Sequence, residues 1–231
     1  AAACNTGNTA SGAQDTWTVL VYLDGDNNLE KDALKDLNEM ELVGSNDQVR
    51  IVVQLDRVRQ DGPKDDTSNG DWDTAKRFLV KRDSNRSRIG STELDDIGEV
   101  NMGDPQTLVD FVSWGVKAYP AERYALVLWD HGSSWAGIAF DDTSDQKGIS
   151  LPELDQALAA LEHDFRELDV VLRVLVVGAD EHLALGAALP LRRFLGALVD
   201  QQHHQGDIGM VGGDGVGDVL HHHRLAALRA G

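Results

Sequence analysis

A histidine between an acid and a glycine is the residue of this chain best placed to do chemistry. His131 closely follows five consecutive apolar residues, Ala125 to Trp129, which are too few for a helix and predict a strand buried on both faces. Open α/β sheets place their reactive groups at the carboxyl ends of such strands. The same residues would also suit a polar turn whose imidazole only satisfies a loop hydrogen bond.

Acidic residues near two predicted loops offer a second kind of chemistry. Asp24 and Asp26 follow one strand, and Asp141, Asp142 and Asp145 follow the histidine segment. Carboxylate oxygens are the ligands that calcium prefers, but the spacing does not match a twelve-residue calcium loop. Capping of loops explains these residues equally well. We therefore predict no cofactor and no metal site, and leave calcium open as an alternative.

The last quarter of the sequence holds two weaker candidates. The tracts 203–204 and 221–223 are histidine-rich and could bind a metal, but no regular ligand spacing supports a built site. The glycine-rich stretch 209–217 has no lysine and no convincing strand-to-helix setting for a phosphate. A metal- or nucleotide-binding α/β protein is therefore the weakest of the functions considered.

Composition limits the partners. The formal net charge of −18 disfavours nucleic acid and anionic membranes, and favours a cationic partner. The single cysteine, Cys4, rules out an internal disulfide, and no apolar run is long enough to span a membrane. Residues 1–4 end in that cysteine as a bacterial lipoprotein signal does, and residues 1–15 suit a flexible tether. An incidental cysteine on a disordered terminus is the alternative.

Periodicity predicts the elements that would position His131. Buried strands are expected at 17–23, 49–55 and 125–129, a fourth begins at 168–172, and 72–80 suits one strand of a peripheral hairpin. Helical patterns lie between the buried strands. Their predicted starts are a capping box of Asn27 with Glu30, the pair Asp104-Pro105, and a capping box of Ser150 with Glu153. These repeats predict an α/β fold with a mostly parallel sheet flanked by helices.

Four segments carry a resemblance to a known family. Residues 21–30, 101–108, 126–135 and 151–154 resemble, in order and spacing, motifs of the clostripain family of cysteine peptidases, over about residues 16–170. The resemblance implies a caspase-like three-layer α/β/α fold, a His–Cys dyad and cleavage after arginine or lysine. It makes His131 the dyad histidine, which takes the thiol proton. It also makes Gly132 a backbone donor to the oxyanion.

The sequence departs from the family pattern at the nucleophile. The family places a cysteine at the end of the next strand, in an Asp-Ala-Cys sequence. Here the corresponding window, residues 175–185, contains no cysteine. Asp180 stands where the family's pocket acid precedes the nucleophile, and His182 stands in the cysteine's place. Because imidazole does not replace a thiolate, and Cys4 precedes the first strand, the chain as written is predicted to be inactive.

A change in composition accompanies this loss. Residues 170–231 contain no Lys, Asn, Ser, Thr, Trp, Tyr or Cys. A GC-rich gene translated in the wrong reading frame gives an amino-acid composition of this kind, so we infer a frame error near residues 170–173. A natural low-complexity tail is the alternative. The predicted organisation is a tether (1–15), the N-terminal part of a peptidase domain (16–170), incomplete on its C-terminal side, and an atypical tail (171–231).

The sequence therefore predicts a clostripain-type cysteine endopeptidase that acts on proteins or peptides with basic residues. The expected location is outside the cytoplasm, either secreted or held at the bacterial envelope by a lipid on Cys4. The main alternative is a catalytically dead caspase-like module that binds or scaffolds without cleaving.

Overall fold

The computed structural model describes residues 16–59, 67–133, 136–144, 146–165 and 171–178. Strands and helices alternate along most of this length, with a pair of strands inserted before the second helix. In chain order the elements are β1 (Trp17–Gly25), α1 (Glu30–Glu41), β2 (Val49–Arg57), β3 (Ala75–Leu79), β4 (Thr92–Gly98), α2 (Pro105–Ala118), β5 (Arg123–Asp130), α3 (Leu151–Phe165) and β6 (Val171–Gly178). No helix in these ranges is long and apolar enough to cross a membrane.

The strands form one six-stranded sheet in the order β4-β3-β2-β1-β5-β6. β1 pairs in parallel with β2 and with β5, and β5 pairs in parallel with β6. The hairpin of β3 and β4 continues the sheet beyond β2 in antiparallel fashion. The predicted mostly parallel sheet with a peripheral hairpin is confirmed, and its parallel strands end at the same edge.

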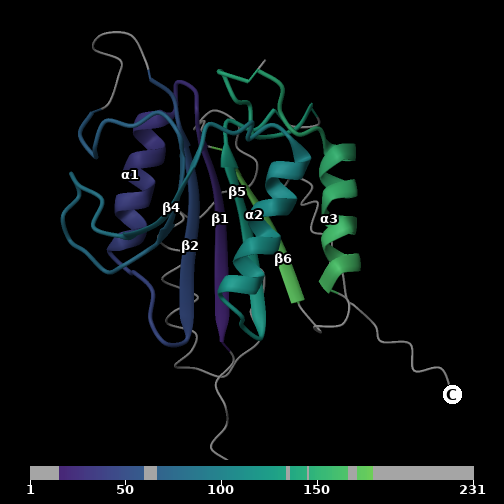
Figure 1. Ribbon diagram of the computed structural model, residues 1–231, viewed down its shortest axis with the longest axis horizontal. Helices are drawn as coiled ribbons and strands as arrows, with labels where there is room; N and C mark the ends of the chain where they lie inside the picture. Colours follow the sequence, from purple (N-terminus) through teal and green to yellow (C-terminus); the bar gives the residue numbers. More distant parts are fainter. Residues whose placement is uncertain (1–15, 60–66, 134–135, 145, 166–170, 179–231) are drawn as a thin grey trace, which may run out of the picture.

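Helices cover both faces of the sheet, as Figure 1 shows for α1 on one side and for α2 and α3 on the other. Alternate residues of each central strand point to opposite faces. Val19, Val21 and Leu23 of β1 therefore join the core beneath α1, whereas Leu20 and Tyr22 join the core beneath α2 and α3. Both faces of β1 are thus fully buried, which explains its continuous apolar sequence.

The helix starts agree with the sequence in two cases of three. Asp104 accepts a hydrogen bond from the Gln106 N–H at 2.8 Å at the start of α2. At α3, Glu153 accepts from the N–H and hydroxyl of Ser150, at 3.0 and 2.7 Å. Both starts lie at the predicted residues.

The capping box predicted for α1 is wrong. The helix begins at Glu30, its N-cap is Leu29, and no side chain caps it. Asn27 instead accepts from the Leu29 N–H at 2.8 Å and closes a turn before the helix. Glu30 is unavailable for capping because its carboxylate is buried in an ion pair with Arg57 of β2, at 2.7 Å. A tertiary contact therefore overrides the local pattern.

Candidate active site

His131 lies at the carboxyl edge of the sheet, directly after β5. Its imidazole is half-buried, and Nε2 is 2.8 Å from Oδ1 of Asn28, in the loop between β1 and α1. An acceptor oxygen opposite Nε2 favours the tautomer with the proton on Nε2 and leaves the lone pair on Nδ1. The loop that follows the neighbouring strand β1 thus supplies the residue that orients the ring.

The residue before the histidine anchors three segments. The buried carboxylate of Asp130 accepts from Nδ2 of Asn27 at 2.9 Å and from the Phe140 N–H at 2.6 Å. The same amide of Asn27 also donates to the Phe140 carbonyl at 3.1 Å. Burial raises the pKa of Asp130, although these donors and the N–H of His131 oppose the rise by favouring the charged form. The backbone of His131 is therefore fixed between the loops that follow β1 and β5.

Gly132 adopts a backbone conformation that favours glycine. Its φ is 61°, in the left-handed region that other residues enter only with strain. Beyond it, the Ser133 N–H donates to the Gly137 carbonyl at 2.8 Å and the Ala136 N–H to the Ser133 carbonyl at 2.9 Å, so the chain turns back at this point. The role of the Gly132 N–H as an oxyanion donor stays a prediction.

Comparison with known proteins identifies this arrangement. The sequence model of the clostripain family matches residues 21–173, about two thirds of the chain. The chain belongs to the clostripain family. The matched stretch ends within a few residues of position 170, where the sequence predicted the likeness to stop. It includes His131 and Gly132 and leaves out Cys4, Asp180 and all but the first three residues of the atypical tail.

Two similar proteins show what share of a longer peptidase this chain matches. Clostripain of Hathewaya histolytica is 28% identical over 122 residues, which cover 50% of this chain and 23% of the relative. A secreted C11 cysteine protease from Bacteroides thetaiotaomicron, solved with an irreversible peptide inhibitor, is similar with a TM-score of 0.50 and 25% identity. That likeness covers 63% of this chain and 39% of the solved one. The chain thus spans less than half the length of either relative.

Three predicted site residues lie outside the described residues. These are Cys4, Asp180 and His182, the last two of which follow β6. The register pairs Asp130 with Gly178, so β6 ends level with the strand that leads to His131. A residue that followed β6 in a clostripain-type protein would thus leave the sheet at the edge where His131 lies.

The structure brings together only part of the predicted calcium candidates. Asp26 and Asp141 lie close to each other, but the other two members of their group are Asp56 and Glu99, which the sequence analysis missed. Asp24 and Asp142 are not in the group, and Asp145 lies outside the described residues. The four carboxylates come from four separate segments, so no local spacing could reveal them. The only sequence feature that could have indicated this group is that polar residues stand at the ends of β1 and β2.

Proposed function

We propose that this domain is the histidine-bearing part of a cysteine endopeptidase that cleaves peptide bonds after arginine or lysine. The observation that carries the proposal is the position of His131, at the carboxyl edge of β5 with its ring oriented by Asn28, in a chain of the clostripain family. The same edge receives the end of β6, after which the family places its nucleophile.

The tautomer set by Asn28 assigns the proton transfers. With Nε2–H donating to the Asn28 oxygen, Nδ1 of His131 carries the lone pair that would take the proton of a thiol. The thiolate would attack the carbonyl carbon of the scissile peptide, and the oxyanion would accept a hydrogen bond from the N–H of Gly132. The protonated Nδ1 would then give its proton to the leaving amine, which departs as the acyl-thioester forms.

A basic side chain before the scissile bond would need an acidic pocket. The net charge of −18 raises the local concentration of cationic peptides around the whole protein. Through the family resemblance, Asp180 is the residue proposed to bind the substrate's guanidinium or ammonium group. Proteins and peptides with exposed arginine or lysine are accordingly the proposed partners.

The chain as written would bind such peptides without cleaving them. Its one cysteine is Cys4, and no cysteine follows His131 in the printed sequence. Two explanations are open: a frame error that replaces the nucleophile, or a natural binding module. Translation of the coding DNA across codons 160–185 in all three frames separates them, because only a frame error would show another frame continuing into Asp-Ala-Cys.

Activity measurements test each explanation. The chain as written should release no fluorophore from arginine or lysine substrates in the presence of a reducing agent. It should bind a labelled arginine peptide more tightly than the matched citrulline peptide. Thiol-dependent cleavage that disappears in His131→Ala would overturn the proposed inactivity. If the corrected frame exists, the corrected chain should cleave both substrates, and activity that survives His131→Ala would refute the dyad.

We also propose that the protein acts outside the cytoplasm, because the solved relative from Bacteroides thetaiotaomicron is described as secreted. A lipid on Cys4 would hold it at the envelope, and this would be its only membrane contact. Mass spectrometry of the N-terminal peptide from the native host tests this. A diacylglyceryl mass on Cys4 is expected, and an unmodified thiol would exclude the anchor.

A further inference from the structure

The side chain of Asn27 joins three segments at the carboxyl edge of the sheet. Asn27 lies in the turn between β1 and α1 and is only 3% exposed. Its Nδ2 donates to Asp130 at 2.9 Å and to the Phe140 carbonyl at 3.1 Å, and its Oδ1 accepts from the Leu29 N–H at 2.8 Å. An asparagine amide has two N–H donors, so it can serve both acceptors at once. The amide is therefore held from both of its ends.

Asn28, which contacts the imidazole of His131, depends on this neighbour for its position. Asn28 is exposed, and an exposed polar side chain keeps much of its rotamer freedom. The bond from the Leu29 N–H to Oδ1 of Asn27 closes a turn around Asn28 and restrains its backbone. The Glu30 N–H adds a bond to the Asn27 carbonyl at 3.3 Å. The buried residue thus places the exposed one.

The loop after β5 is held at both backbone groups of Phe140. The Phe140 N–H donates to Asp130 at 2.6 Å, and the Phe140 carbonyl accepts from Asn27. The preceding residue, Ala139, is buried and has a φ of 61°, a left-handed conformation that alanine adopts only with strain. Strain of this kind persists only where the surrounding contacts over-determine the backbone. The contacts of Asn27 and Asp130 with Phe140 are part of that restraint.

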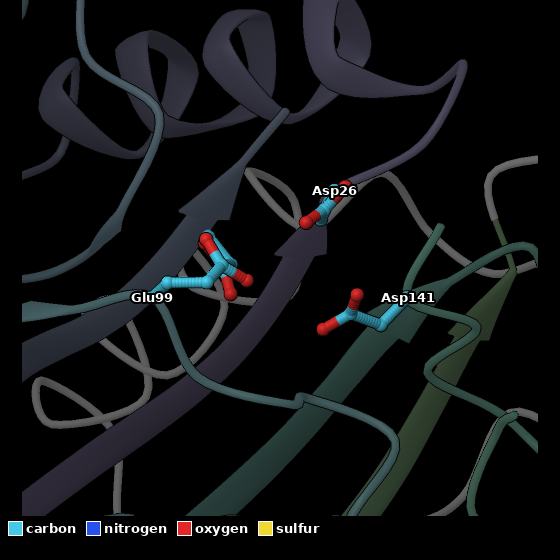
Figure 2. Close-up of side chains that lie close together, drawn as sticks. Asp26, Glu99 and Asp141 are labelled. Atoms are coloured by element: carbon cyan, nitrogen blue, oxygen red, sulfur yellow. The ribbon is translucent and has the colours of Figure 1, made fainter. Parts of the chain in front are cut away.

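A backbone contact joins the same two loops directly before Asn27. The Asp142 N–H donates to the Asp26 carbonyl at 2.8 Å. Figure 2 shows Asp26 and Asp141 on these two loops, with their carboxylates directed toward the same space. The backbone at Asp26 and the side chain of Asn27 therefore both connect the loop after β1 to the loop after β5.

We propose that Asn27 is a positioning residue of the proposed peptidase: it holds Asn28 against the His131 imidazole and so fixes the orientation of the ring. The proposal rests on the proposed function, because only a proton transfer at Nδ1 gives this orientation a catalytic consequence. Asp130 directly precedes His131, and Asn27 directly precedes Asn28. The hydrogen bond between Asn27 and Asp130 thus aligns the two residues whose side chains meet at Nε2.

The test observes the imidazole itself, in the chain as written, and needs no cleavage. Long-range ¹H–¹⁵N correlation spectra at pH 9, where imidazoles are neutral, report which ring nitrogen is protonated. The His131 signals are those that His131→Ala removes. In the unmodified chain its two ring ¹⁵N resonances should be widely separated, with the proton on Nε2. Asn28→Ala removes the acceptor, so the two tautomers should interchange and the resonances should move toward each other.

The diagnostic variant is Asn27→Asp. A carboxylate keeps an acceptor for the Leu29 N–H but has no N–H to donate to Asp130 or to the Phe140 carbonyl. The turn can therefore persist while the link between the two loops is lost. The ¹⁵N resonances of His131 should move toward each other, as they do in a ring without its acceptor.

An exchange of the two side chains separates positioning from a general loss of stability. In the double variant Asn27→Asp/Asp130→Asn the amide stands at position 130, where it can donate to the carboxylate at position 27 and still accept from the Phe140 N–H. This variant should recover at least half of the lost ¹⁵N separation. If Asn27→Asp does not fold, Asn27→Ser, which also removes the amide donors, takes its place.

Asn38→Asp is the matched control. Asn38 lies on α1, is 2% exposed, and donates from Nδ2 to the Leu34 carbonyl at 2.7 Å and to Asn69 at 3.2 Å. Its variant should melt several degrees lower, as Asn27→Asp should, but leave the His131 resonances unchanged.

Three outcomes would overturn the proposal: two interchanging tautomers in the unmodified chain, an unchanged separation in the Asn27 variant, or an equal response in Asn38→Asp. Cleavage tests the proposed function separately. If the corrected frame exists, Asn27→Asp in the corrected chain should lower kcat at least tenfold and leave KM nearly unchanged, since a misplaced catalytic group costs rate rather than binding. A corrected chain that cleaves nothing would refute the proposed function and not the orientation of the ring.

Discussion

Replacement of Asp36 by asparagine should stabilise the protein at neutral pH. Asp36 lies on α1, is half-buried, and accepts a hydrogen bond from Nε1 of Trp129 at 2.9 Å. Burial raises the pKa of its carboxyl to about 6, and the Trp129 bond opposes the rise only in part. An asparagine can keep that bond through its own oxygen while removing the buried charge.

The magnitude follows from the difference between the folded and unfolded pKa values. A rise from 3.8 to about 6 corresponds to at most about 3 kcal/mol, since each unit is worth about 1.4 kcal/mol. Because water screens the exposed part of the side chain, about 1–2 kcal/mol is the expected effect. Between about pH 4 and pH 6 the folded chain binds more protons than the unfolded chain, so the free energy of unfolding decreases as the pH rises.

Urea unfolding followed by circular dichroism measures this effect. Asp36→Asn should be about 1–2 kcal/mol more stable than the unmodified chain at pH 7.5, and the difference should vanish below about pH 4. Asp47→Asn, which removes an exposed charge, should show no comparable gain. If Asp36→Asn were no more stable at pH 7.5, or if its gain persisted at pH 4, burial of the Asp36 charge would not be the cause.

Three further substitutions test the packing around the site by the same unfolding assay. Glu30→Ala leaves the buried guanidinium of Arg57 without its carboxylate and should destabilise the fold by about 3–5 kcal/mol, whereas a loss below 1 kcal/mol would show that the pair is not desolvated. Gly103→Ala would place a Cβ in steric conflict with the backbone oxygen of Lys147, so a loss of at least about 2 kcal/mol is expected, and an unchanged midpoint would contradict this close approach. Ser150→Ala removes the hydroxyl that donates to Glu153 and should cost about 1 kcal/mol, while Ser150→Thr should restore most of it.

The buried strands were predictable because their sequences are continuously apolar, but the ends of those strands were not. Predicted strands stopped at Leu23 and Leu55, whereas β1 and β2 each continue for two more residues. The first added residues are Asp24 and Asp56, which pair in register and are both fully buried. A periodicity argument excludes buried acids from a strand, so it ends each strand just before these two acids.

The outermost strand, β4, was hard to predict because its sequence has no continuous apolar run. No residue of β4 is buried and three of its residues are acids, so its sequence resembles a loop. Only its antiparallel pairing with β3 identifies it as a strand. Glu99 directly follows this strand, so no pattern in the sequence indicated that it would lie close to Asp26 and Asp141.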